Sequence, residues 1–358
     1  MNATSDAWSE SRPQDVSDTE LMESICENER DHEHMVGKSG RQVKLNRFAL
    51  MIIVGLLMVV ASYAQSFDPR DLQGTWTNAT ITPFERPVEL GDREFLTENE
   101  IRELEARSAA NRVDRAPQAG DVGNYNQFWF DSGTKVVKTR RTSLVVEPKN
   151  GRVPVKPEAE AKRDYNAAHN SDSYEFMSIW DRCITRGVPA GMFPAGYNNA
   201  YQIMQTPDSI IILSEMIHEA RIIPLDGRPH LPSNVKQWNG DSRGRWEGNT
   251  LVVDTTNYND KGWIGTSAST GRIKGIPQSE SLHVVERLTR VDRDTINYEV
   301  TITDPKYFTQ PWKVSIPLNR DPEYRIYEYA CQEGNHAVEN VLSGGRTQEK
   351  EQAAKSQN

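Results

Sequence analysis

The chain of 358 residues contains only three cysteines and no glycine-rich phosphate-binding motif. Neither G-x-x-x-x-G-K-[ST] nor G-x-G-x-x-G occurs, so the sequence does not indicate a nucleotide or dinucleotide cofactor. Basic residues are outnumbered as well, because 42 Lys and Arg residues accompany 51 Asp and Glu residues, which gives a net charge of −9. Such a balance provides no basic surface for nucleic acid. We therefore expect neither an organic cofactor nor a nucleic-acid partner.

Apolar runs of membrane-spanning length are also lacking. The run at residues 48–61 follows basic residues between Lys38 and Arg47 and precedes the small residues around Tyr63, which is the order of a secretory signal peptide. A bilayer span needs about 20 apolar residues, so this run is short for a permanent anchor. We expect a signal peptide at residues 35–64, a secreted or periplasmic protein, and no stable membrane anchor after cleavage. The alternative is retention in the membrane through residues 48–64.

The remainder of the chain divides by composition. Residues 1–34 are mostly acidic and polar, which predicts either disorder or an extension ahead of a true start at Met35. Residues 65–342 are long enough for a single β-rich domain with its own core. The polar residues 343–358 predict a disordered tail.

The cysteines favour an oxidising compartment. Cleavage of the signal peptide would remove Cys26 and leave Cys183 and Cys331 as the only cysteines. Two such thiols often pair outside the cytosol. We expect a Cys183–Cys331 disulfide, with two buried free thiols as the alternative.

From Asn199 onward, segments rich in Val, Ile, Thr and Tyr alternate with short turn sequences. This pattern is typical of strands joined by short connections, which favour an antiparallel meander. Closure into a barrel removes exposed strand edges, and Gly74-Thr-Trp76 resembles the Gly-x-Trp opening of lipocalin barrels. Capping signals at Thr97 and Pro157 indicate helices. The sequence thus predicts a mainly β fold, an antiparallel meander closing into a lipocalin-like barrel, with a few peripheral helices and a ligand cavity at one end.

The stretch from Gly240 to Asp254, GDSRGRWEGNTLVVD, begins with a match to the G-x-S-x-G pattern of serine hydrolases. A nucleophile elbow requires a helix after the serine, but the residues after Ser242 alternate and then turn at Gly248-Asn249. The segment therefore predicts a hairpin and not a serine nucleophile. A two-residue turn places Arg243 opposite Asp254, and we expect an ion pair between them.

Two positions are open for this pair. Arg243, Arg245 and Asp254 share one face of the hairpin, whereas Trp246 and Leu251 share the other, which resembles a core face. On a solvated outer face the pair would contribute only about 0 to 1 kcal/mol to stability. In a polar barrel interior it would hold a ligand carboxylate or hydroxyl and orient a catalytic group.

Histidine suits proton transfer because its ordinary pKa is near 6.5. We assign catalytic roles to three residues: His218 moves a proton, Arg243 holds a developing negative charge, and Asp254 orients that arginine. A histidine hydrogen-bonded in a turn is the alternative for His218. Substrate-binding roles are assigned to further polar residues, namely Arg221, His230, Asp241, Arg245 and Glu286.

Metal binding is not indicated. The spacing of His218, Glu219 and His230 matches no recognised zinc signature. Alternation along a strand also places His218 and Glu219 on opposite faces. We therefore expect no metal site.

Four motifs carry a resemblance to a known family. They are Asp226-Gly-Arg-Pro-His230, the stretch from Trp238 to Thr255, Val285-Glu-Arg287 and Glu328-Tyr-Ala-Cys-Gln-Glu-Gly-Asn335. Over residues 67–342 the chain resembles a large family of uncharacterised secreted bacterial proteins with a GDSRGRWEG(D/N)TLVVDT signature. The chain departs from the family pattern at Asn249, Gln332 and His336, where the family has Asp, His and Tyr. The resemblance implies secretion but no particular reaction, and Gln332 argues against a mechanism that uses a histidine beside Cys331.

The favoured hypothesis is a cofactor-free acid/base enzyme, a lyase, isomerase or hydrolase that acts on a small amphipathic or aromatic compound. The alternatives are a non-catalytic periplasmic ligand-binding or carrier barrel and an envelope interaction protein. A polar cavity that contains His218, Arg243 and Asp254 would favour the enzyme. An apolar cavity with these residues outside it would favour the carrier.

Overall fold

The computed structural model describes residues 68–113, 130–265 and 273–356, which belong to one compact unit, Phe67–Asn358. The predictions for residues 1–34 and for the signal peptide at 35–64, and with them Cys26, lie outside the described residues.

Strands make up most of the regular structure, as the enrichment in β-branched and aromatic residues predicts. The strands are β1 (Gly74–Thr77), β2 (Val145–Glu147), β3 (Ala200–Gln205), β4 (Ser209–Ser214), β5 (Glu219–Pro224), β6 (Asp241–Glu247), β7 (Thr250–Thr256), β8 (His283–Asp292), β9 (Thr295–Thr303) and β10 (Trp312–Arg320). The α-helices are α3 (Glu98–Ala110), α4 (Pro157–Ala168) and α5 (Ala337–Ser356).

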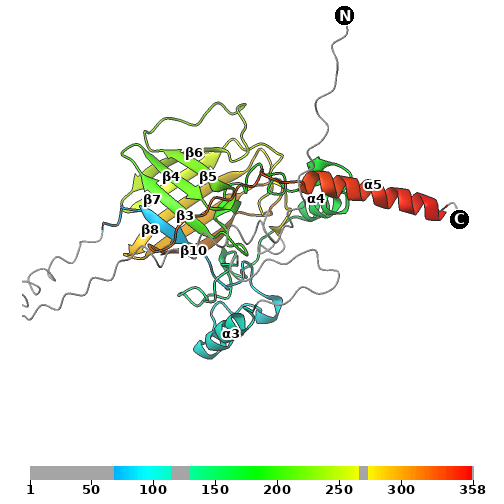
Figure 1. Ribbon diagram of the computed structural model, residues 1–358. Coiled ribbons are helices and arrows are strands. Elements are labelled where there is room, and N and C mark those ends of the chain that lie inside the picture. The colour runs from blue at the N-terminus through cyan, green and yellow to red at the C-terminus, as the bar shows by residue number, and fades with distance from the viewer. Residues whose placement is uncertain (1–67, 114–129, 266–272, 357–358) are drawn as a thin grey trace, which may run out of the picture. The chain divides into compact units, whose positions relative to one another are not determined.

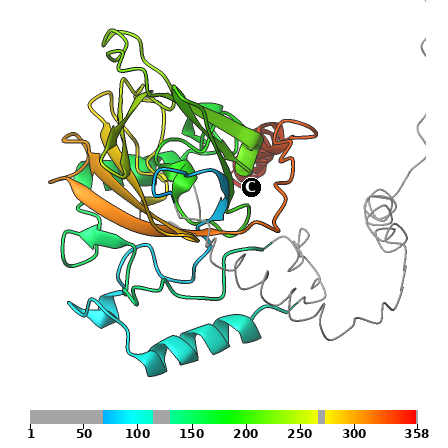
Figure 2. The same ribbon diagram turned by 90° about the vertical axis from the view of Figure 1, so that its left-hand side faces the viewer.

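The strands form one antiparallel sheet that curves into a nearly closed barrel (Figures 1 and 2). Hydrogen bonds connect them in the order β5-β4-β3-β1-β10-β9-β8-β7-β6, and β2 pairs with β10 off this path. Consecutive strands β6 to β10 form a meander, and so do β3 to β5. The predicted fold class, a mainly antiparallel β-barrel with a few helices, is confirmed.

The barrel closes at a seam between β5 and β6, the two ends of the hydrogen-bonded path. Each of the eight pairings along the path is antiparallel, so β6 must run parallel to β5. Parallel neighbours need a crossover connection of about a dozen residues or more, and residues 225–240 provide one. The seam is therefore the one junction around the barrel that lies outside the hydrogen-bonded path.

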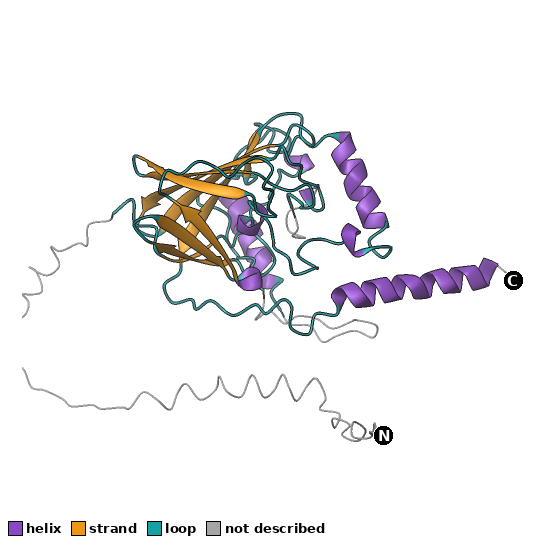
Figure 3. Ribbon diagram, turned by 90° about the horizontal axis from the view of Figure 1, so that it is seen from above, coloured by secondary structure: helices purple, strands orange, loops and turns teal. Residues whose placement is uncertain are grey.

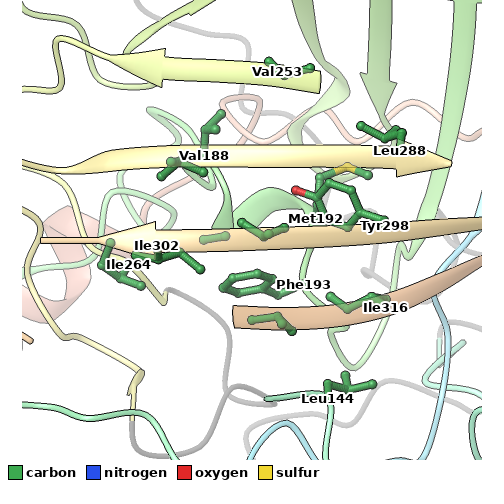
Figure 4. Packing of buried hydrophobic residues seen from close by; sticks show 14 of the residues in the cluster. Leu144, Val188, Met192, Phe193, Val253, Ile264, Leu288, Tyr298, Ile302 and Ile316 are labelled. Carbon is green, nitrogen blue, oxygen red and sulfur yellow. The ribbon is translucent and has the colours of Figure 1, made fainter. Parts of the chain in front are cut away.

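Apolar side chains fill the interior of the barrel. Trp76 is fully buried, and its indole Nε1 donates a hydrogen bond to the carbonyl of Leu72 (2.9 Å). The segment before β3 also enters the core: Figure 4 shows Met192 and Phe193 lying near Tyr298 and Ile316 of the barrel strands. This segment thus packs into interior space that a ligand would occupy in a lipocalin-like barrel.

The helices lie outside the barrel (Figures 1 and 3). At the start of α3, Thr97 and Glu100 form the predicted capping box. None of the described helices is both long and apolar enough to cross a membrane.

The C-terminal segment differs from its prediction. Residues 343–356, expected to be a disordered tail, continue α5. Their polar side chains include many good helix formers (Ala, Glu, Gln and Lys), and Arg346 donates a hydrogen bond to the carbonyl of Ser171 (2.9 Å). Polarity alone therefore does not predict disorder in this segment.

Candidate functional site

A buried polar layer closes the seam from inside the barrel. Arg221 of β5 donates from Nη1 to Oε1 of Glu286 on β8 (2.9 Å), and from Nη2 to the hydroxyls of Ser242 (2.9 Å) and Thr255 (3.1 Å). The phenol of Tyr298 donates to the same Oε1 of Glu286 (2.7 Å). The layer thus links β5 to β6, β7, β8 and β9.

The charges of this layer are matched. The side chain of Arg221 is 12% exposed and that of Glu286 is 1% exposed. Burial alone lowers the pKa of Arg221, but the charge of Glu286 and the hydrogen bonds to it raise the pKa more, and the net shift is upward. Burial raises the pKa of Tyr298 well above its usual value. Arg221 and Glu286, predicted to bind substrate, lie together inside the barrel as each other's partners.

The predicted register of the hairpin is confirmed, since Arg243 lies opposite Asp254. Their face points away from the core side chains Leu251 and Val253, so the pair lies on the outside of the barrel. The expected ion pair between them is wrong. Arg243 instead pairs with Asp241 (Nη1 to Oδ1, 2.7 Å), because this carboxylate lies on the same strand and the same face.

The carboxylate of Asp254 contacts two histidines instead of the expected Arg243. His230 Nε2 is 3.0 Å from Asp254 Oδ1, and His283 Nε2 is 2.9 Å from Oδ2. The other ring nitrogen of His230, Nδ1, is 3.0 Å from Asp241 Oδ2. The side chain of His283 is 42% exposed, whereas that of Asp241 is 6% exposed. His230, Asp241, Arg243 and Asp254 form what we term the crossover clamp.

The crossover clamp fastens residues 225–240 to the outer face of the barrel. Arg243 donates from Nε to the carbonyl of Pro229 (3.1 Å), and the amide of Leu231 donates to Asp241 (2.9 Å). The side chain of Asn257 donates to the carbonyl of Leu231 (2.9 Å). A structural role therefore accounts for four residues that the sequence assigns to a site: His230, Asp241, Arg243 and Asp254.

Both glycines of the GDSRG motif lie where neighbouring parts of the chain approach closely. A Cβ atom on Gly244 would lie 2.6 Å from Leu225 Cδ2 and 2.9 Å from Ile223 Cγ2, so any other residue would force β5 or these side chains to shift. Gly240 has φ +68°, and a Cβ there would lie 2.6 Å from the carbonyl oxygen of Thr256. Ser242 lies within β6 and is 8% exposed, and a strand position does not have the geometry of a nucleophile elbow.

Arg245 lies apart from these groups. Its Nη2 is 2.6 Å from Oε1 of Glu247, and Arg287 contacts the other oxygen of that carboxylate (2.9 Å). All three side chains are at least 40% exposed. These contacts form a solvated surface ion-pair network, which adds little to stability.

His218 lies in a separate hollow of about 330 Å³. It ends the turn Met216–His218 between β4 and β5, and its Nδ1 is 2.6 Å from the carbonyl oxygen of Tyr329. A carbonyl only accepts, so this contact requires the proton on Nδ1, and in the neutral ring Nε2 is then an acceptor. The structure does not bring His218 into the crossover clamp with Arg243 and Asp254.

The backbone at His218 is unusual. Ile217 has φ +63° and His218 has φ +41°. A β-branched residue in the left-handed region is a genuine outlier, and such outliers gather at functional sites. Glu219 lines the same hollow and accepts hydrogen bonds from Thr185 (2.7 Å) and from Asn239.

The predicted disulfide is formed and lines the His218 hollow. Cys183 and Cys331 are bonded, with their Cα atoms 5.6 Å apart. Both cysteines line the His218 hollow together with Glu333, and all three also line a second hollow of about 490 Å³. We term this second one the aromatic hollow, because three rings line it together with carboxylates; these side chains are Trp180, Tyr197, Tyr329, Asp181, Glu328 and Glu333.

Sequence reasoning missed the aromatic hollow. The rings of Tyr197 and Tyr329 stack with their centroids 6.4 Å apart, and Trp180 lies 6.3 Å from Tyr197. Each ring comes from a different segment, and none of these segments is a strand. The cysteine pair was the only sequence signal that joined two of them.

A second buried polar group was also missed. Glu215 is 1% exposed and accepts hydrogen bonds from the phenol of Tyr324 (2.9 Å) and from Asn198. Burial raises the pKa of Glu215. Burial also raises the pKa of Tyr201 to about 12 and lowers the pKa of Arg186.

Within the described ranges, no group of three or more His, Cys, Asp or Glu residues is placed to hold a metal ion. Comparison of the chain with models of protein families, with curated proteins and with solved structures finds no match.

Proposed function

We propose that the protein is a secreted or periplasmic acid/base enzyme, a lyase, isomerase or hydrolase that acts without an organic cofactor on a small amphipathic or aromatic compound. The supporting observation is the placement of His218, an exposed imidazole in a hollow with Nδ1 fixed by the carbonyl of Tyr329 (2.6 Å). The disulfide supports the compartment, because such bonds persist in oxidising surroundings.

The chemistry assigned to His218 is proton transfer through Nε2. With Nδ1 holding its proton on the carbonyl, Nε2 takes a proton from a substrate carbon or from a water molecule. The resulting imidazolium returns this proton to another position of the substrate or to a leaving group. The left-handed backbone at Ile217 and His218 supports a functional role, because it fixes the ring at a conformational cost that packing must offset.

The substrate class is taken from the aromatic hollow beside the histidine. Trp180, Tyr197 and Tyr329 present apolar ring faces, while Tyr phenols and the indole also hydrogen-bond. Flat aromatic or amphipathic molecules suit such walls. The catalytic roles first expected for Arg243 and Asp254 are not part of this proposal, because the crossover clamp engages both side chains.

The test is hydrogen exchange into candidate substrates. A panel of small amphipathic and aromatic compounds is incubated with the protein in D₂O, and mass spectrometry detects deuterium uptake or conversion. Wild type should act on a member of the panel, and His218→Ala should lower the rate about 10²- to 10⁴-fold, the usual contribution of a general acid/base. His336→Ala is the matched control, since that histidine is exposed and lies outside the His218 hollow.

Two results would overturn the proposal. If His218→Ala retains the wild-type rate while His283→Ala loses it, the reaction belongs to the imidazole on Asp254. If compounds bind with a measurable Kd but none gains deuterium or is converted, the protein is a carrier.

A further inference from the structure

A third hollow, of about 560 Å³, lies between α4 and α5 at the end of the barrel where both helices are found (Figures 1 and 3). Its volume is typical of a small-molecule site. Apolar and aromatic side chains from three segments line it: Phe176, Met177, Trp180, Trp263, Ala337 and Val341. We term it the α4–α5 hollow.

The charged side chains at this hollow differ in whether they have a hydrogen-bond or ion-pair partner. Arg163 is held by Asp164 (Nε to Oδ1, 2.8 Å), and Asp181 accepts a hydrogen bond from the hydroxyl of Ser178 (2.8 Å). Lys274 is exposed, and among the described residues its ammonium group has no hydrogen-bond or ion-pair partner. Lys274 therefore offers an unneutralised positive charge beside an apolar, aromatic space.

The α4–α5 hollow adjoins the aromatic hollow. Trp180, Asp181 and Ala337 line both, and the aromatic hollow in turn shares the disulfide and Glu333 with the His218 hollow. The three hollows are thus neighbours, each of which shares lining residues with the next, and we refer to them together as the trough.

Charge gives this trough a direction. The aromatic hollow in the middle carries three carboxylates, Asp181, Glu328 and Glu333, and none of its lining side chains is basic. Of these three only Asp181 also lines the α4–α5 hollow, and there Lys274 lines the same space. An anionic group would be repelled there and attracted to Lys274. A molecule in the trough would therefore place its anionic end in the α4–α5 hollow and its other end toward His218.

We propose that the α4–α5 hollow binds the aromatic body of an amphipathic organic anion, with its ring system between Phe176, Trp180 and Trp263 and its anionic group at Lys274. This names the substrate class of the proposed enzyme and rests on that proposal only for the link to His218. The binding itself does not require catalysis.

The test uses 8-anilinonaphthalene-1-sulfonate, an aromatic anion whose fluorescence rises in apolar surroundings, titrated into the folded protein. We expect one saturable site. Lys274→Gln should raise Kd about two- to fivefold, as expected for one partly exposed charge contact. Val341→Trp fills the hollow and should raise Kd more than about tenfold, beyond the effect of the charge. Lys149→Gln, an exposed lysine outside the hollow, is the control and should bind as wild type.

The inference is overturned if the dye shows no saturable binding, or if Lys274→Gln and Val341→Trp both bind as tightly as wild type with unchanged circular dichroism. His218→Ala should keep wild-type dye affinity. Loss of deuterium uptake in His218→Ala with intact dye binding supports both proposals. Dye binding that survives Lys274→Gln and Val341→Trp, with uptake that still depends on His218, removes only this inference. Specific dye binding without any turnover removes only the enzyme.

Discussion

The buried pair of Arg221 and Glu286 makes the sharpest prediction about stability. Glu286→Ala removes the carboxylate that the guanidinium contacts through both Nη atoms, and leaves a positive charge inside the barrel with only the hydroxyls of Ser242 and Thr255 as partners. Breaking a buried pair from one side costs about 3 to 5 kcal/mol. Loss of the hydrogen bond from Tyr298 adds about 1 kcal/mol, because its phenol is then buried without this acceptor. We expect the free energy of unfolding to fall by about 4 to 6 kcal/mol.

A double-mutant cycle separates this charge effect from loss of packing. Arg221→Met and Glu286→Leu together remove both charges and keep most of the volume, and such replacements are often neutral or stabilising by about 1 to 4 kcal/mol. Urea unfolding, followed by tryptophan fluorescence, gives the free energy for wild type, both single variants and the double variant. A cost below about 1 kcal/mol for Glu286→Ala, or additive costs of the two single replacements, would refute the view that this pair closes the seam.

Three further predictions concern the stability of the same fold. Gly244→Ala should lower the free energy of unfolding by about 1 to 3 kcal/mol in urea titrations, because its methyl group overlaps Leu225; an unchanged midpoint would contradict the close approach at the seam. Burial raises the pKa of Glu215, so its proton stabilises the fold below the ordinary value of 4.5, and this stability is lost as the pH rises through the raised pKa. Glu215→Gln should therefore lose less stability than wild type between acid and neutral pH, and parallel pH profiles would count against the assignment. Replacing Cys183 and Cys331 by Ala opens a loop with a sequence separation of 148 and should cost about 3 to 5 kcal/mol, which calorimetry checks; a wild-type melting temperature would show that the bond adds nothing.

Local sequence patterns predicted the parts of this fold that local physics determines. The alternation after Ser242 and the Gly248-Asn249 turn set the hairpin register, and Arg243 indeed lies opposite Asp254. Turn length and alternation suffice for that, because both act between neighbours in the chain. The partners of Asp254 were beyond their reach, since His230 of the crossover and His283 of β8 come to this carboxylate from outside the hairpin.

The candidate site required tertiary structure throughout. His218 was identified from its residue type, but its proton position follows from the carbonyl of Tyr329, which is 111 residues away. The aromatic hollow draws its rings from separate irregular segments, which have no periodicity to read. Residues 325–331 are irregular as well, although their composition suits a strand.

Closure of the barrel by side chains has a consequence for how the molecule can change. Eight strand junctions depend on backbone hydrogen bonds, which substitutions alter little. The ninth depends on Arg221, Glu286 and the close approach at Gly244 inside the barrel, and on the crossover clamp outside it. The stability of this junction therefore depends on a few residues that can be substituted. Mutation can strengthen or weaken the barrel at the β5–β6 seam while the backbone hydrogen bonds of the other strand junctions stay intact.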